Sequence, residues 1–303
     1  MKNKFLKVVV FALIVIACVN CNAGICFATS GQKFRVNARN AIAIDRESGE
    51  VLFEQNAYEL VPMASTTKIL TSLITIERGS LDEKFVVSKN AASVRGSKVG
   101  YKAGEELTIR ELLYGLMYRS GNDAAITLAE GIGGSVEGFA EIMNHYAVSL
   151  GLFDSHFETP HGLDSKDHYS SAYDLAMLTS KGMEYDTFRE IVGTKAISRD
   201  KYGFTRDYNN INKILWKIPG ANGVKTGYTG QAGKCLVSSV HYKGKDIIIV
   251  VLNCSDRWNQ TEKIFKHVQE TVAFQGKNMK VLASDDLDVY GYKKDDGQFE
   301  VRL

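Results

Sequence analysis

The sequence has little net charge, few cysteines and no apolar run long enough to span a membrane. Its 303 residues include 37 basic and 35 acidic side chains, and no basic block is interleaved with aromatic residues. A nucleic-acid partner is therefore not expected. The chain has five cysteines, but at this length it can bury a sizeable core, so its stability needs no disulfide or metal.

Metal ligands and cofactor motifs are also missing from the pattern. The six histidines show no spacing typical of a metal site, and we predict neither a metal nor a cofactor; they are residues 145, 156, 161, 168, 241 and 267. The histidines of the polar loop 154–169 are expected to be structural hydrogen-bonding residues. There is no internal repeat and no low-complexity linker.

The N-terminus has the layout of a secretory signal. Lys2, Lys4 and Lys7 precede an apolar run from Val8 to Ala17, which is followed by small and polar residues. That run is about half of the ~20 residues that a membrane-spanning helix needs. We predict a signal peptide over residues 1–28 and export of the protein to the extracytoplasmic face of the cell envelope.

Two alternatives concern the same end of the chain. Val15-Ile-Ala-Cys18 resembles a lipobox, so a lipid anchor at Cys18 competes with cleavage after Ala28. Cleavage at 28 would leave only Cys235 and Cys254, which are either a disulfide or a free buried pair.

The order of predicted elements indicates an α+β protein. Strands are expected at both ends of the chain, over residues 41–45, 51–54, 224–227, 236–240 and 247–252. Helical periodicity dominates the middle and the end, over residues 65–78, 109–130 with a break at 120–122, 136–150, 173–182 and 257–274. We predict an antiparallel sheet built from both ends of the chain and flanked by helices, with a mostly helical subdomain. The catalytic domain would span 34–276, followed by a tail over 277–303.

Ser65 and Lys68 form the first candidate pair for chemistry. Residues three apart lie on one helical face, so the lysine amine can reach the serine hydroxyl. The lysine can act as a general base only if its pKa is lowered, by burial or by a neighbouring cation. The pattern alone is weak, because Ser30 with Lys33 and Ser198 with Lys201 match it by chance.

Two further triplets follow in the chain. In Ser120-Gly-Asn122, the hydroxyl can relay a proton and the amide can orient a substrate or the lysine, although such residues are also common helix breakers. Ser88-Lys-Asn90 matches the same pattern. Lys225-Thr226-Gly227 lies on a predicted strand, where a cation and a hydroxyl can receive a carboxylate and an extended peptide can pair with the strand edge.

The three triplets, in this order and spacing, resemble the signature of penicillin-binding proteins and serine β-lactamases. More narrowly, the chain resembles the low-molecular-mass D-alanyl-D-alanine carboxypeptidases of peptidase family S11 from about Ala38 to Phe274. The matching stretches are Pro62-Met-Ala-Ser-Thr-Thr-Lys, Ser120-Gly-Asn-Asp-Ala-Ala, Thr159-Pro-His-Gly-Leu-Asp and Gly223-Val-Lys-Thr-Gly-Tyr-Thr.

The resemblance implies a function and a role for each matching residue. The substrate would be a peptidoglycan stem peptide ending in D-Ala-D-Ala, and β-lactams would be covalent inhibitors. Ser65 would be acylated, Lys68 would accept its proton and Ser120 would relay a proton, while Asn122 positions the substrate amide. The other implied contacts are Lys225 and Thr226 at the carboxylate, Gly227 beside it, Tyr228 in the oxyanion hole with Ser65, and Arg257 as a second carboxylate ligand.

Other functions fit the sequence less well. A class A β-lactamase needs a deacylating glutamate in a Glu-x-x-Leu-Asn loop, and Glu158 occurs here without that motif. A β-lactam sensor would need a transmembrane helix or a cytoplasmic effector, and neither is visible. The short tail lacks a basic amphipathic stretch, so no C-terminal membrane anchor is expected. Carboxypeptidase and endopeptidase action share one machinery and both remain open.

Overall fold

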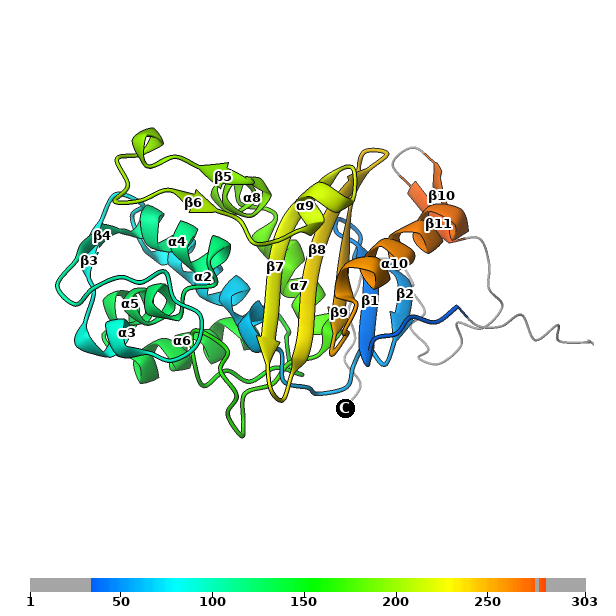
Figure 1. The fold of residues 1–303 in the computed structure, drawn as a ribbon. Helices are drawn as coiled ribbons and strands as arrows, with labels where there is room; N and C mark the ends of the chain where they lie inside the picture. Colours follow the sequence, from blue (N-terminus) through cyan, green and yellow to red (C-terminus); the bar gives the residue numbers. More distant parts are fainter. Residues whose placement is uncertain (1–33, 276–277, 282–303) are drawn as a thin grey trace, which may run out of the picture. The chain divides into compact units, whose positions relative to one another are not determined.

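The structure, a computed structural model, describes residues 34–275 and 278–281. The predicted signal peptide and most of the predicted tail lie outside these residues. The described residues from Val36 onward belong to one compact unit, in which a sheet lies beside a group of helices (Figure 1).

The central sheet has five antiparallel strands in the order β2-β1-β9-β8-β7. Their bounds are β1 Asn40–Asp45, β2 Val51–Gln55, β7 Ala221–Thr229, β8 Gly233–Tyr242 and β9 Lys245–Leu252. Strand β1 pairs with β2 on one side and with β9 on the other, so the two ends of the chain share one sheet. The predicted fold class is confirmed.

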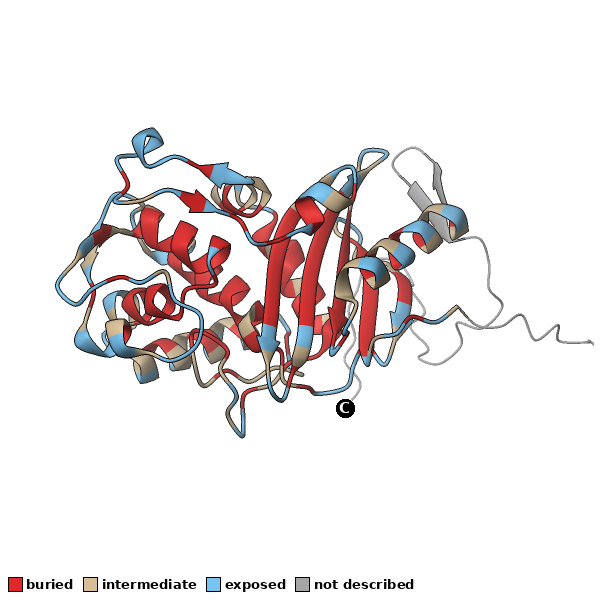
Figure 2. Ribbon diagram, in the orientation of Figure 1, coloured by how far each residue is buried: buried red, intermediate tan, exposed pale blue. Residues whose placement is uncertain are grey.

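The sheet is covered by helices on both faces. Helix α10, Arg257–Thr271, lies in front of the strands in Figure 1, and α7, Ala172–Gly182, lies behind them. Both helices contact β9, whose residues from Ile247 to Leu252 are all buried. This explains the unbroken apolar run of β9, since a strand covered on both faces needs no polar side (Figure 2).

The remaining helices form the helical part beside β7. They are α2 Lys68–Arg78, α3 Lys89–Ser93, α4 Ile109–Tyr118, α5 Asn122–Gly133, α6 Val136–Ser149, α8 Asp186–Gly193 and α9 Ile214–Lys217. The four long helices predicted in this region are confirmed within a few residues. Helices α4, α6 and α7 start where a hydroxyl side chain accepts a backbone N–H of the first turn, from Thr108, Ser135 and Ser171.

Several short elements were not predicted, and one boundary was wrong. The unpredicted strands form two two-stranded sheets, β3 Lys84–Val86 with β4 Glu106–Thr108 and β5 Ala196–Ile197 with β6 Tyr208–Asn209. Helix α10 ends at Thr271 and not at 274. From Val272 the chain is extended, because strand β10, Val272–Gln275, pairs with β11, Asn278–Val281.

Candidate active site

Ser65 lies in a 3₁₀ turn, η1 Ala64–Thr67, that leads directly into α2. The predicted spacing places Lys68 one turn later on the same face, and its Nζ lies 2.8 Å from Ser65 Oγ. Ser65 is half-buried, whereas Lys68 is completely buried. The candidate nucleophile is therefore a partly accessible residue whose hydroxyl contacts a buried amine.

The Lys68 amine is surrounded by oxygen atoms. Besides Ser65 Oγ, its Nζ contacts Asn122 Oδ1 at 2.8 Å and the backbone oxygen of His161 at 2.6 Å. Burial, and then the charge of Lys225, hold the pKa of Lys68 well below its usual range. A neutral amine at this position is therefore favoured at a pH where a free lysine would be charged.

The second triplet forms the connection between α4 and α5. Ser120 is buried with a positive φ of 56°, and its Oγ accepts a hydrogen bond from Lys225 Nζ at 3.0 Å. Asn122 begins α5, and its Nδ2 donates to the backbone oxygen of Arg95 at 2.7 Å. That bond fixes the amide orientation and turns Oδ1 toward Lys68. The break in helical periodicity thus brings two polar side chains to the nucleophile.

The third triplet lies on β7, an edge strand of the sheet. Lys225 is buried, and its Nζ donates to Ser120 Oγ and to the backbone oxygen of Thr226. Burial and the neighbouring Arg257 lower the pKa of Lys225 to about 7. Lys225 and Lys68 therefore join β7 and α2 to the same α4–α5 connection.

Gly227 lies directly against the nucleophile turn. A Cβ added there would be 3.0 Å from the backbone oxygen of Met63 and 3.2 Å from the backbone nitrogen of Ser65. The missing side chain therefore lets β7 approach the turn. Tyr228 follows with 67% of its surface exposed, so the strand beyond Gly227 is open to a bound molecule.

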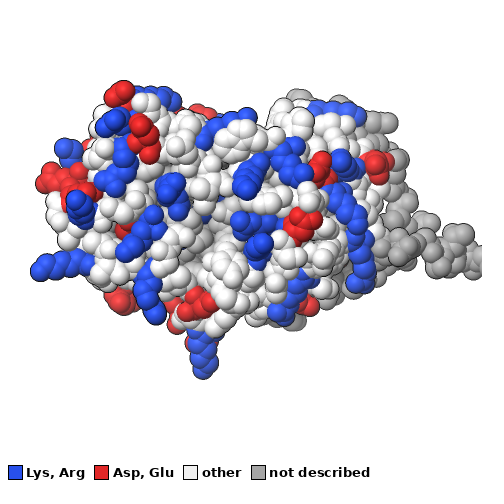
Figure 3. Space-filling view, viewed as in Figure 1, with Lys and Arg blue, Asp and Glu red and all other residues white. Residues whose placement is uncertain are grey.

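Arg257 reaches β7 from the start of α10. Its Nη1 donates to the backbone oxygens of Gly227 and Cys235, at 2.7 and 3.0 Å, and its guanidinium stacks on Trp258. Nε is buried without a hydrogen-bond partner. The structure therefore places the Arg257 guanidinium beside the strand of Lys225 and Thr226. Figure 3 shows Lys and Arg side chains spread over this whole face, with fewer Asp and Glu side chains between them.

The loop 154–169 contributes contacts that the residue-type analysis missed. The backbone oxygen of His161 contacts Lys68 Nζ, and Gly162 has a φ of +81° where any Cβ would collide with the backbone oxygen of Ala64. His168 accepts the backbone N–H of Glu158 at Nδ1, so Nε2 carries the hydrogen that faces Thr67 Oγ1 at 2.9 Å. Burial lowers the pKa of His168 to about 4, which keeps this arrangement neutral. The only sequence signal for this loop was the Thr159-to-Asp164 stretch, which is one of the stretches that match the family.

The chance matches have other roles. Ser198 and Ser88 cap the starts of η2, Arg199–Lys201, and of α3 by accepting backbone N–H groups. Lys201 pairs with Glu190 at 3.2 Å. Ser30 lies outside the described residues. The Glu158 carboxylate accepts hydrogen bonds from Ser165 and Asp167 of its own loop rather than from the nucleophile.

The cysteine, acidic and histidine residues of the described part of the chain form neither a disulfide nor a metal site. Cys235 and Cys254 are both buried and free rather than disulfide-bonded. Within the described ranges, no group of three or more His, Cys, Asp or Glu residues is arranged to hold a metal ion. None of the helices placed there combines the length and apolarity needed to cross a bilayer.

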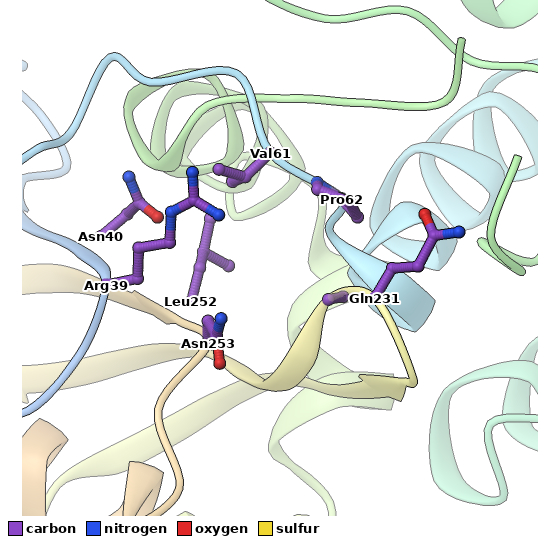
Figure 4. A pocket seen from close by; sticks show the side chains of 8 residues that line it. Arg39, Asn40, Val61, Pro62, Gln231, Leu252 and Asn253 are labelled. Atoms are coloured by element: carbon purple, nitrogen blue, oxygen red, sulfur yellow. The ribbon is translucent and has the colours of Figure 1, made fainter. Parts of the chain in front are cut away.

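A small hollow lies apart from the three triplets, between β1, the segment leading to Ser65 and the β7–β8 turn (Figure 4). Its lining is Arg39, Asn40, Val61, Pro62, Gln231, Ala232, Leu252 and Asn253. Asn40 Nδ2 donates to the backbone oxygen of Asn56 and to Glu59, while Asn40 Oδ1 has no partner. The hollow contains none of the predicted site residues.

Comparisons with known proteins agree on one family. Residues 27–256 match the family model of D-alanyl-D-alanine carboxypeptidase, peptidase family S11. The chain is 37% identical over 235 residues to the D-alanyl-D-alanine carboxypeptidase DacF of Bacillus subtilis, covering 76% of this chain and 60% of that protein. Over 246 residues it is also 37% identical to DacC of Escherichia coli, with the same coverages.

A solved structure shows the same likeness in three dimensions. A mutant of the Streptomyces K15 DD-transpeptidase superposes with a TM-score of 0.74 at 32% sequence identity, covering 78% of this chain and all of that one. The chain spans about three fifths of the length of the two curated relatives. Since the family model covers most of the sequence, the chain belongs to the D-alanyl-D-alanine carboxypeptidase family, peptidase family S11.

Proposed function

We propose that this protein is a serine-type D-Ala-D-Ala carboxypeptidase that trims peptidoglycan stem peptides outside the cytoplasm. The observation that carries the proposal is the hydrogen bonding of Lys68. A neutral amine has two N–H donors, and Asn122 Oδ1 and His161 O can only accept. Ser65 Oγ is the third partner of Lys68 Nζ, at 2.8 Å, and a neutral amine that donates to the other two oxygens turns its lone pair toward this hydroxyl.

The chemistry then follows from the positions of the side chains. Ser65 Oγ attacks the carbonyl of the penultimate D-alanine while Lys68 takes the hydroxyl proton. The C–N bond breaks, and the departing D-alanine amine receives a proton through Ser120, which contacts Lys225 Nζ at 3.0 Å. Water then hydrolyses the ester on Ser65 and regenerates the hydroxyl.

Two backbone N–H groups would stabilise the oxyanion of the tetrahedral intermediate. Ser65 N lies against Gly227, and Tyr228 N follows one residue later on the exposed part of the strand. Fixed N–H donors of this kind contribute several kcal/mol of transition-state stabilisation, about 2.7–4 kcal/mol for one donor.

The terminal carboxylate of the substrate would bind at Lys225, Thr226 and Arg257. A charge-assisted hydrogen bond to such a group is worth about 1.5–3 kcal/mol. Arg257→Ala should therefore lower kcat/KM on a free D-Ala-D-Ala terminus by about 10- to 150-fold. A peptide amidated at its C-terminus should lose almost nothing, because it never made the contact.

Steady-state kinetics on that matched pair of peptides decides the role of Arg257. Equal losses on both peptides would assign Arg257 to the support of β7 through Gly227 O and Cys235 O, with the carboxylate held by Lys225 and Thr226 alone.

The acyl group on Ser65 can be transferred to an amine instead of water, which is a transpeptidation. The K15 relative carries the name DD-transpeptidase. Penicillin should acylate Ser65, and hydrolysis of the resulting penicilloyl ester should be slow. The glutamate needed for fast deacylation has no counterpart here, since Glu158 is held within its own loop. A β-lactamase is therefore disfavoured.

The proposal is tested by incubating the protein with diacetyl-Lys-D-Ala-D-Ala and, separately, with penicillin. We expect free D-alanine from the peptide and a stable mass increase of one penicillin per chain. Release of no D-alanine, together with rapid penicillin turnover, would overturn the carboxypeptidase assignment.

A further inference from the structure

The site has a direction, which follows from the proposed function and on which this inference rests. In the proposed complex the terminal carboxylate would lie toward Lys225 and Thr226, and the attacked carbonyl would lie beside Ser65 and Gly227. The rest of the peptide must therefore continue the other way, past Tyr228 and Thr229. With about 3.3 Å per residue along a strand, the residue before the two D-alanines lies opposite this end of β7.

Asp164 lies at that end of the strand. Its Oδ1 accepts from Thr229 Oγ1 at 2.5 Å and its Oδ2 from the backbone N–H of Gln231 at 3.2 Å. It is three residues after His161, whose backbone oxygen contacts Lys68. Both ends of the carboxylate are thus fixed relative to the nucleophile, although the residue itself is exposed.

Two hydrogen bonds do not saturate the carboxylate. An ionised carboxylate has about four lone-pair sites, so about two remain for a ligand. The contacts from Thr229 and Gln231 come from neutral donors, which leaves the negative charge of Asp164 without a cation among the hydrogen bonds that hold it. A ligand that supplies an ammonium group would complete it.

We propose that Asp164 binds the side-chain ammonium of the residue that precedes the two D-alanines, and so selects stem peptides with a free amine there. A diamino acid such as lysine has a side chain long enough, at about 6 Å, to reach from the peptide backbone to the rim of β7. Asp164 then determines specificity for the part of the peptide that stays bound to Ser65 as the acyl group. Lys225 and Arg257 hold the terminal D-alanine, which leaves.

The experiment compares two peptides that differ only in that amine, acetyl-Lys-D-Ala-D-Ala with a free ε-amine and its diacetyl form. The wild type should prefer the free amine by about 5-fold in kcat/KM at low salt, the size expected of an exposed ion pair with fixed geometry. Asp164→Asn, which keeps an acceptor for Thr229 but removes the charge, should abolish the preference. About 0.5 M salt should reduce it in the wild type.

Two control variants separate charge from support. Asp167→Asn removes a charge from the same exposed loop and should leave the preference intact. Thr229→Val removes one bond that holds Asp164 and should lower the preference without removing it. Equal losses of kcat/KM on both peptides in Asp164→Asn would overturn the inference. Asp164 would then only hold the loop against Thr229 and Gln231.

The wild type also separates the two levels of the proposal. Equal cleavage of both peptides would overturn the inference while the carboxypeptidase proposal stands. Cleavage of neither peptide would overturn both.

Discussion

Ser65→Ala should eliminate covalent labelling by penicillin and reduce D-alanine release at least about 10⁴-fold, because no other group can form the ester. Mass spectrometry of the intact protein, followed by peptide mapping, measures the adduct directly. The fold should survive, since Ser65 is only half-buried and alanine fits the same turn.

The chance matches supply the controls for this experiment. Ser198→Ala and Ser88→Ala should label like the wild type, because both serines only cap short helical turns. An adduct that persists in Ser65→Ala, or one that maps to either control position, would contradict the assignment of the nucleophile.

Lys68→Arg should slow acylation about 10³- to 10⁴-fold, near the upper range for loss of a general base. Arginine keeps a positive charge and several donors, but it cannot give up its proton at workable pH. The acylation rate is measured by stopping the reaction with penicillin at set times and quantifying the covalent adduct. The thermal unfolding midpoint shows whether the buried site still accommodates the larger side chain. Lys201→Arg, in the exposed turn η2, is the matched control.

The pH profile of acylation reports the same lysine. Since burial and Lys225 lower the pKa of Lys68, its neutral form persists below the usual lysine range, and the rate should fall once the pH drops through that lowered value. Lys225 must keep its proton to attract the carboxylate, and its pKa of about 7 predicts a second decline above neutrality. A pH-independent acylation rate between about pH 6 and 10 would contradict a titrating lysine base.

The residue types and spacing predicted the three triplets but not the contacts that the loop 154–169 makes with the segment from Ala64 to Lys68. Ser65, Lys68, Ser120, Asn122 and Lys225 are recognisable because each carries a reactive or polar group. His161 contributes a backbone oxygen and Gly162 an absent side chain, and neither has a signature in composition or periodicity. The neutral form of His168 depends on burial and on the Glu158 N–H, which only the folded loop reveals.

The fold followed the same division. Strong periodicity placed the long helices and the apolar run of β9. The two-stranded sheets β3–β4 and β5–β6 were missed because strands of two or three residues are too short to show a period, and only their pairing defines them. Helix α10 was extended too far because Val272 and Phe274 fit either period, and the pairing with β11 decides for strand.

The position of β1 has a consequence for the order in which the chain can fold. Strand β1 is synthesised before the other strands of this sheet, yet one of its edges stays unpaired until β9 exists, because Asn40 to Asp45 pair with Ile247 to Leu252. Closing so long a loop is entropically costly, so the pairing forms late. A fragment that ends before β9 cannot complete the sheet. Strand β7, which carries the third triplet, pairs with β8, and β8 is joined to β1 through β9. Nearly the whole domain must therefore be synthesised before the three triplets can form an active site.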